Sequence, residues 1–191
     1  ALAASGLLTP KLGGPSVRPY MPAGVWDEVS VYGDLRNYKA DPGPDRHRRT
    51  MYTVWKRTAA PPTMLLFDAP NREVCTVRRS RTNTPLQALA LLNEFTYVEA
   101  ARALAGRMTA EGGATPADRL TYGFRVVTAR RPTAAELAVL TDGYAADLAR
   151  FRADPEAAKR LLAASAADAD LAALTLAANV LLNLDEVVTR E

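Results

Sequence analysis

The sequence has little that could hold a metal ion or a covalently attached cofactor. It contains a single cysteine, Cys75, and a single histidine, His47, among 191 residues. One cysteine excludes an internal disulfide framework, and one histidine excludes a histidine-rich metal site. No Cys-x-x-Cys-His run for covalent haem attachment is present. We therefore expect this chain to hold no cofactor.

Long hydrophobic runs are also missing. No stretch approaches the roughly 18 uninterrupted apolar residues of a membrane span, so we expect no membrane-spanning segment. Residues 1–10 lack methionine, a basic start and a long apolar run, which distinguishes them from a signal peptide. They resemble the end of a helix, and we expect a domain truncated at its N-terminus.

Alanine and helix-boundary residues dominate the second half of the chain. Alanine carries the smallest helix penalty, and Thr84 with Gln87, like Thr133 with Glu136, has the spacing of a capping box. Gly112 is typical of a helix end. These signals predict helices over residues 85–93, 94–110, 116–129, 134–152 and 155–164, and a last one from residue 168. We therefore expect an all-α (mainly α) fold.

The N-terminal third is different. Seven prolines and glycines stand between residues 9 and 24, which argues against regular structure there. We expect an irregular, extended segment packed on a multi-helix bundle. Residues 1–83 would form the loop-rich part and residues 84–191 the bundle, together making one continuous domain.

Two elements are expected within the loop-rich part. Asp45 can cap a helix over residues 46–58, in which Met51 and Trp55 share one face and arginines occupy the others. Residues 73–77 alternate in polarity, which predicts a short extended stretch.

Positive charge is concentrated in the middle of the chain. Nine cations and two anions stand between Arg46 and Arg81, so this stretch carries +7 and the remainder −4, giving the total of +3. Such asymmetry can mark a surface for acidic partners. It also fits arginines that pair with carboxylates of other segments within the fold.

The best candidate site lies directly before the helix start at Thr84. Its residues are Arg78, Arg79, Arg81 and Asn83. Free amides at a helix N-terminus attract anions, and guanidiniums would add bidentate contacts to a carboxylate, sulfate or phosphate. The alternative is an internal network that holds the extended segment against the helices.

Other chemistry-bearing residues give weaker signals. A lone histidine such as His47 is a poor base without an orienting partner. Cys75 has an apolar neighbour, and we expect a buried, inert thiol. Trp55 shares its face with Met51, which predicts core packing and argues against nucleic-acid binding by stacked aromatics.

Several runs resemble one family. They are Ser5–Leu8, Gly14–Tyr20, Arg48–Thr58, Phe67–Pro70, Arg72–Asn93 and Leu181–Glu186. Together they look like the C-terminal part of the planctomycete cytochrome-linked domain of unknown function. The resemblance implies a large exported protein, periplasmic or on the cell surface, with an N-terminal cytochrome-c-like domain. No catalytic residues are established for the region.

Two functions remain open from the sequence. The first is a non-catalytic helical scaffold or interaction domain that docks other domains of the same polypeptide or an anionic polysaccharide. The second is part of a secreted hydrolase or oxidoreductase whose active site is completed by a preceding region. In that case Asp68, Glu73 or His47 would supply proton transfer, so enzymatic activity is undecided.

Overall fold

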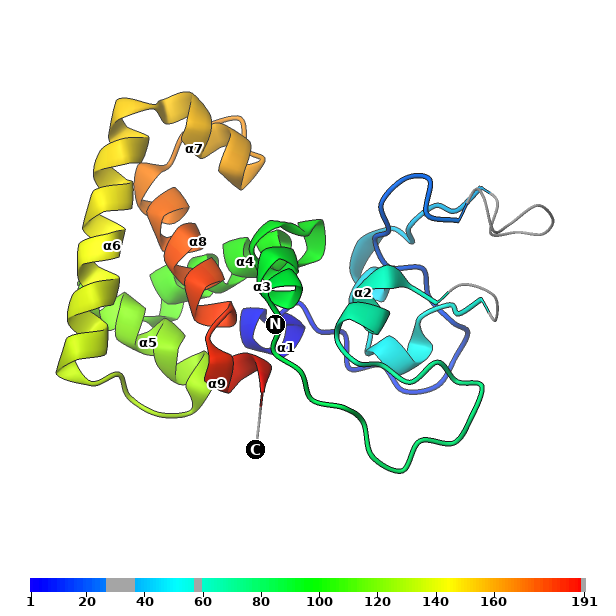
Figure 1. Ribbon diagram of the computed structural model, residues 1–191. Helices are drawn as coiled ribbons and strands as arrows, with labels where there is room; N and C mark the ends of the chain where they lie inside the picture. The colour runs from blue at the N-terminus through cyan, green and yellow to red at the C-terminus, as the bar shows by residue number, and fades with distance from the viewer. Residues whose placement is uncertain (27–36, 57–59, 190–191) are drawn as a thin grey trace. The chain divides into compact units, whose positions relative to one another are not determined.

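The computed structural model describes residues 1–26, 37–56 and 60–189 (Figure 1). It divides into two compact units: unit 1 is Ala1–Gly6 with Leu91–Glu191, and unit 2 is Leu7–Ala90. Helices make up the regular structure of these residues, which contain isolated β-bridges, such as Thr9 with Arg48 and Val17 with Thr53, and no strand. The predicted mainly α fold is confirmed.

Unit 1 is a bundle built around one buried helix. Its helices are α1 (Leu2–Ser5), the end of α3 (Pro85–Asn93), α4 (Phe95–Glu111), α5 (Pro116–Thr128), α6 (Ala134–Ala153), α7 (Pro155–Leu162), α8 (Ala169–Leu182) and α9 (Asp185–Val188). Figure 1 shows α8, in orange to red, beside α6 and α4. Because α8 is alanine- and leucine-rich on all sides, it can be buried almost throughout. The helices expected from residue 84 onward are confirmed, and their observed ends lie within two residues of the expected ones.

Small side chains bring the central helices close together. Ala100, Leu104 and Met108 of α4 are completely buried, as are Ala173 and Ala178 of α8. These two helices share the most extensive contact in the unit. Alanine at such positions lets the two backbones approach, so leucine and methionine pack against alanine between α4 and α8. The buried aromatic residues of the unit, Phe124, Tyr144 and Phe151, lie on α5 and α6.

The helix starts in unit 1 are fixed by side-chain caps. The predicted box is present: the Glu136 amide donates to Thr133 Oγ1 at 3.3 Å, and the Thr133 amide donates to Glu136 Oε2 at 2.7 Å. A second box joins Thr115 and Asp118 at the start of α5. Each cap stabilises its helix by about 1 kcal/mol.

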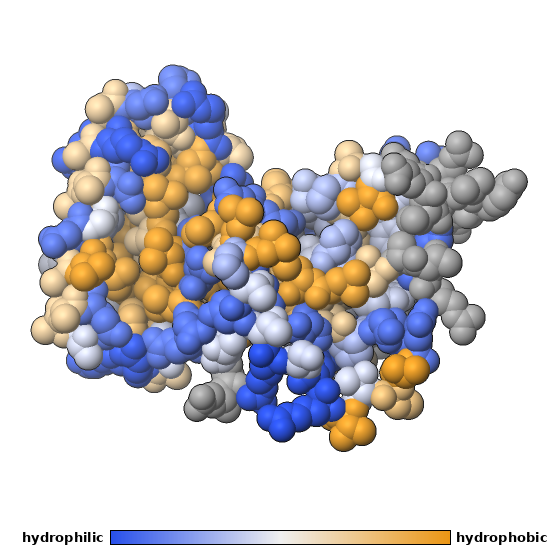
Figure 2. Space-filling view, in the orientation of Figure 1, coloured by the Kyte–Doolittle hydropathy of each residue, from blue (hydrophilic) through white to orange (hydrophobic). Residues whose placement is uncertain are grey.

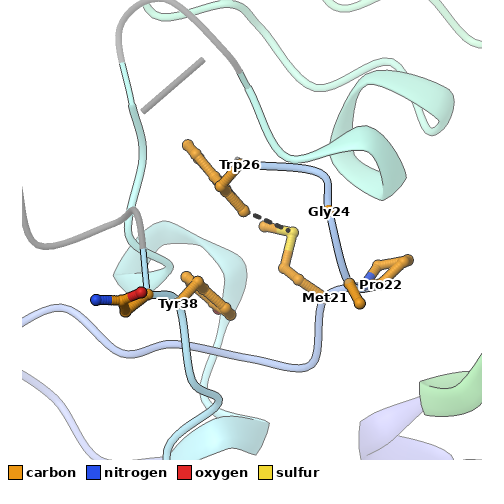
Figure 3. A pocket seen from close by; sticks show the side chains of 7 residues that line it. Met21, Pro22, Gly24, Trp26 and Tyr38 are labelled. Atoms are coloured by element: carbon orange, nitrogen blue, oxygen red, sulfur yellow. Dashed lines mark hydrogen bonds between the residues drawn. The ribbon is translucent and has the colours of Figure 1, made fainter. Parts of the chain in front are cut away.

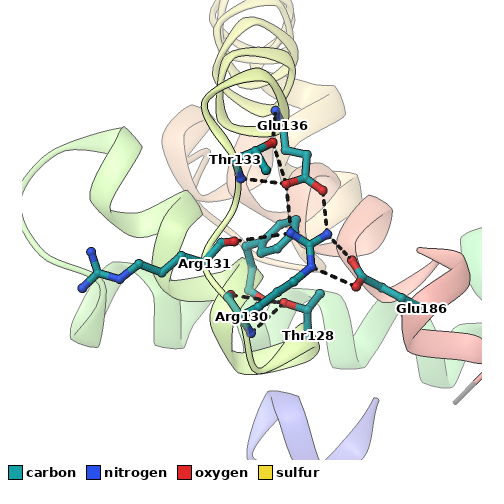
Figure 4. A network of polar contacts seen from close by, with 7 residues as sticks. Thr128, Arg130, Arg131, Thr133, Glu136 and Glu186 are labelled. Carbon is teal, nitrogen blue, oxygen red and sulfur yellow. Dashed lines mark hydrogen bonds and ion pairs between the residues drawn. The ribbon is translucent and has the colours of Figure 1, made fainter. Parts of the chain in front are cut away.

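The Thr133 box continues into an ion-pair network centred on Arg130 (Figure 4). The Arg130 guanidinium contacts Glu136 at 2.6 Å and Glu186 at 2.7 Å, and lies 4.7 Å from the centre of the Phe124 ring. One side chain thereby connects the α5–α6 turn, the first turn of α6 and α9. Because all three ionic groups are partly exposed, the network stabilises through geometry more than through burial.

This network predicts an acid-sensitive step in stability. Arg130, followed by the amide and hydroxyl of Thr133, lowers the pKa of Glu136 from 4.5 to about 2. A carboxyl whose pKa is depressed by folding stabilises the fold above its unfolded pKa and loses that contribution as pH falls through its folded pKa. We expect Glu136→Gln to lower the Tm at pH 7, and the difference from the unsubstituted chain to vanish between pH 4.5 and about 2. Thermal unfolding across this range measures it. Glu73→Gln, at an exposed side chain of unit 2, is the control, and an equal pH dependence in both variants would contradict the prediction.

Unit 2 has short elements joined by irregular chain. They are the 3-10 turns η1 (Gly43–His47) and η2 (Thr50–Tyr52), helix α2 (Pro62–Leu66) and the first part of α3. The helix predicted over residues 46–58 is wrong for the residues that the structure describes. Residues 48 and 53 are extended instead, and pair with Thr9 and Val17 in parallel β-bridges. Residues 57–59 of that prediction lie outside the described residues.

Arg48 explains why the helix does not form. Its guanidinium is buried, with 4% of the residue exposed, and lies 3.7 Å from the centre of the Tyr52 ring. It donates to Pro15 O at 3.0 Å. It also donates to Lys11 O at 2.9 Å and to Gly13 O at 2.5 Å. An extended backbone at residue 48 is what lets one side chain hold three carbonyls of the proline- and glycine-rich segment.

Candidate functional site

The predicted site residues lie on an exposed loop between α2 and α3. Arg78, Arg79, Arg81 and Asn83 are all exposed, on a stretch of bends and irregular backbone. Within the described ranges, neither Arg78 nor Arg79 makes a hydrogen bond or an ion pair. The internal network weighed as the alternative is therefore absent for these two arginines.

The loop is closed at its base by Asp68. This residue follows α2 with a positive φ of 56°. Its Oδ2 accepts from the Thr82 amide at 2.9 Å and from the Thr82 hydroxyl at 2.8 Å. The contact spans 14 positions of sequence, so the loop has the form of a surface Ω-loop whose ends are held together.

Gln87 completes the base of the loop. The predicted box with Thr84 is confirmed: Thr84 N donates to Gln87 Oε1 at 2.8 Å, and Gln87 N donates to Thr84 Oγ1 at 3.2 Å. Gln87 is 1% exposed, and its Nε2 also donates to Leu66 O at 2.7 Å and to Thr82 Oγ1 at 2.9 Å. The backbone N–H of Gln87 is therefore already paired with Thr84 at this helix start.

The other end of the loop rests on Trp55. The Arg72 guanidinium lies 4.6 Å from the centre of the Trp55 ring and donates to Thr50 O at 3.4 Å. Trp55 is half-buried beneath this cation, whereas Met51 is 70% exposed. The expected core face of Met51 and Trp55 is therefore wrong for Met51, because the helix that would have aligned them does not form.

The same loop exposes apolar side chains that the sequence did not predict to be exposed. Val74 is 70% exposed, Val77 is completely exposed, and Cys75 is also exposed. The expectation of a buried thiol at Cys75 is wrong, because residues 73–77 form bends at the surface in place of an extended stretch within the fold. Figure 2 shows the loop at the lower edge as hydrophilic side chains, in blue, with apolar ones, in orange.

Two of the three acid and base candidates of the enzyme hypothesis have structural partners, and the third, Glu73, is exposed on the loop. His47 is buried in η1, where its Nε2 accepts from Arg46 Nε at 3.2 Å. Asp68 accepts twice from Thr82 at the base of the loop. Both side chains therefore have positions in the fold that need no substrate.

A pocket of about 250 Å³ lies elsewhere in unit 2 (Figure 3). Its lining is Met21, Pro22, Ala23, Gly24, Trp26, Asn37 and Tyr38. The rings of Trp26 and Tyr38 are stacked at 6.1 Å, and the Trp26 Nε1 donates to Met21 Sδ at 3.3 Å. Burial, with Asp41 adding to it, raises the pKa of Tyr38 to about 12, so the hydroxyl stays protonated and donates to Pro19 O at 2.5 Å. Among the described residues, the lining includes no carboxylate, imidazole or thiol.

Among the residues that the structure describes, no group of three or more His, Cys, Asp or Glu side chains is placed to hold a metal ion. None of the described helices combines the length and apolar character needed to cross a bilayer.

The chain matches a protein-family model. A family model described as PSD1, protein of unknown function (DUF1553), matches residues 1–144. No curated protein and no solved structure matches the chain. The matched residues include the whole of unit 2, and the resemblance at Leu181–Glu186 lies beyond them and stays a prediction. The chain belongs to the PSD1 family of proteins of unknown function (DUF1553).

Proposed function

We propose that this chain is a non-catalytic helical interaction domain that docks an anionic partner through the loop of residues 72–83. The observation that carries the proposal is the exposure of Arg78 and Arg79 without a partner in the described residues. Two exposed guanidiniums on successive residues are suited to bidentate contacts with carboxylate or sulfate groups.

The construction of the loop supports a binding role. Asp68, Thr82 and Gln87 fix one end through short hydrogen bonds, and Arg72 rests on Trp55 at the other. Both ends of the loop are thus anchored while Arg78 and Arg79 are exposed between them. A loop that presents charged groups from fixed ends loses less conformational entropy on binding than a free chain.

The charge of unit 2 supports the same role. Its residues sum to +6, whereas those of unit 1 sum to −3, in agreement with the total of +3. A basic unit attracts acidic partners at long range and steers their approach.

The family resemblance supplies the proposed context. We place the domain in an exported protein, periplasmic or on the cell surface, that carries a cytochrome-c-like domain elsewhere in the polypeptide. The partner would then be another domain of the same protein or an anionic polysaccharide, and the role needs no cofactor held by this chain. Among described residues, no observation favours the hydrolase or oxidoreductase alternative, because His47 and Asp68 have structural partners.

Replacing Arg78, Arg79 and Arg81 together by alanine tests the proposal. We expect the dissociation constants for a sulfated polysaccharide and for polyglutamate to rise roughly tenfold to a hundredfold, since each exposed ionic contact contributes up to about 1 kcal/mol. Titration by isothermal calorimetry or fluorescence anisotropy at low salt measures this change.

A matched variant controls for the loss of three positive charges. Arg125, Arg131 and Arg152 are exposed residues of unit 1, and their replacement by alanine is expected to leave both affinities within about twofold. Unchanged binding in a folded Arg78/Arg79/Arg81 variant would refute the loop as the site. Equal losses in both variants would reduce the effect to net charge.

A further inference from the structure

The loop of residues 72–83 presents two kinds of surface at once. Beside Arg78 and Arg79, the side chain of Val77 is completely exposed and that of Val74 is 70% exposed. A hydrated, sulfated polymer would contact the arginines and leave both valines in water. At the centre of protein–protein interfaces, by contrast, apolar groups are buried and arginine is enriched.

The backbone of the loop also has unpaired polar groups that a partner could bind. Residues 74–80 make no backbone hydrogen bond within the part of the chain that the structure describes. Exposed, unpaired N–H and C=O groups can form hydrogen bonds with another polypeptide. A sugar chain has no regular series of amides to match them.

We propose that the partner of this loop is an acidic protein surface with an aliphatic centre. Its carboxylates would pair with Arg78 and Arg79, while Val74 and Val77 would be buried against its apolar side chains. This inference rests on the proposed function, because it uses the same arginines, and it narrows the class of partner from anions in general to an acidic polypeptide.

Two synthetic peptides of equal length and charge test the class of partner. In one, glutamate alternates with valine, and in the other glutamate alternates with serine. We expect the whole chain to bind the valine peptide about tenfold more tightly than the serine peptide. Burial of the exposed valines should lower the dissociation constant by at least about this factor. Fluorescence anisotropy with labelled peptides measures both dissociation constants, and a sulfated polysaccharide is titrated alongside.

The variant Val74→Ser/Val77→Ser is expected to bind both peptides with the weaker affinity and to keep its affinity for the polysaccharide. Since both valines are exposed, the variant should fold normally. Val139→Ser, at a 72% exposed position of α6 in unit 1, is the control and should retain the tenfold preference.

Each outcome decides between the two proposals. Equal affinity for both peptides, or a preference that persists in Val74→Ser/Val77→Ser, would overturn the acidic protein surface and leave an anion-binding loop. If the chain bound neither peptide nor the polysaccharide, the proposed function would be overturned as well.

Discussion

Replacing Gly112 by alanine is expected to destabilise unit 1 by about 3 kcal/mol, at the upper end of overpacking costs. Gly112 ends α4, and a Cβ there would lie 2.3 Å from Met108 O and 2.7 Å from Arg119 Cα. Both are backbone atoms, so no side-chain rotation can relieve the overlap. The start of α5 would have to move away from the end of α4, which would disturb the packing of both helices. Denaturation by urea, followed by circular dichroism, measures the free energy of unfolding.

Two other glycines provide matched controls. Gly106 in α4 and Gly143 in α6 have nothing within 4 Å of an added Cβ. Alanine is favoured over glycine within a helix by about 0.5–1 kcal/mol, so both substitutions should stabilise the unit slightly. If Gly112→Ala behaved like Gly143→Ala, the close approach of α4 and α5 would be contradicted.

Gly112 also illustrates how far the sequence predicts this fold. It follows an alanine-rich helical pattern, and glycine at a helix end is a local signal, so the end of α4 could be placed correctly. The approach of Arg119 to the same glycine is a tertiary contact, and nothing in the local pattern carries it. Capping boxes behave alike: Thr133 with Glu136 is readable because both partners are three residues apart, whereas the extension to Arg130 and Glu186 is not.

In unit 2 the local pattern gave the wrong structure. Met51 and Trp55 are spaced as on a helix, but helical spacing predicts a helix only if that face has a core to pack against. Here the backbone at residues 48 and 53 pairs with distant segments instead. Arg48 and Tyr52 each form a hydrogen bond with Gly13, which lies 35 and 39 positions away in sequence. Such distant contacts produce no periodic pattern of residues that a sequence could reveal.

The candidate loop was located from sequence but described only in part. Its arginines and the box of Thr84 with Gln87 follow from residue type and spacing. The exposure of Val74, Val77 and Cys75 does not, because alternation of polar and apolar residues predicts an extended stretch with a buried side. What keeps these residues outside is the closure of the loop by Asp68 and Thr82, a contact invisible to periodicity.

Replacing Arg48 by methionine is expected to lower the free energy of unfolding of unit 2 by roughly 2–4 kcal/mol, since hydrogen bonds to a charged donor each contribute about 1.5–3 kcal/mol and desolvation of the charge offsets part of the sum. The guanidinium donates to three carbonyls and stacks 3.7 Å from the Tyr52 ring centre. Methionine would keep much of the packing on Tyr52 but none of the donors. Residues 11–15 are exposed, so water can replace some of the lost bonds, and this limits the effect. Hydrogen exchange at Val17 and Val54, whose amides bond to Tyr52 O and Val17 O, reports the loss locally.

The substitution Arg49→Met at the neighbouring residue is the control, because it removes the same charge from an exposed side chain. We expect it to change the free energy of unfolding by less than about 0.5 kcal/mol, as for ordinary surface substitutions. Arg48→Lys separates charge from geometry, since an ammonium is a compact charge and cannot extend to three divergent carbonyls as a planar guanidinium does. The lysine variant should therefore be nearly as unstable as the methionine variant. If the Arg48→Lys variant were about as stable as the unsubstituted chain, the positive charge alone would hold residues 11–15 in place, and the three directed hydrogen bonds would not be needed.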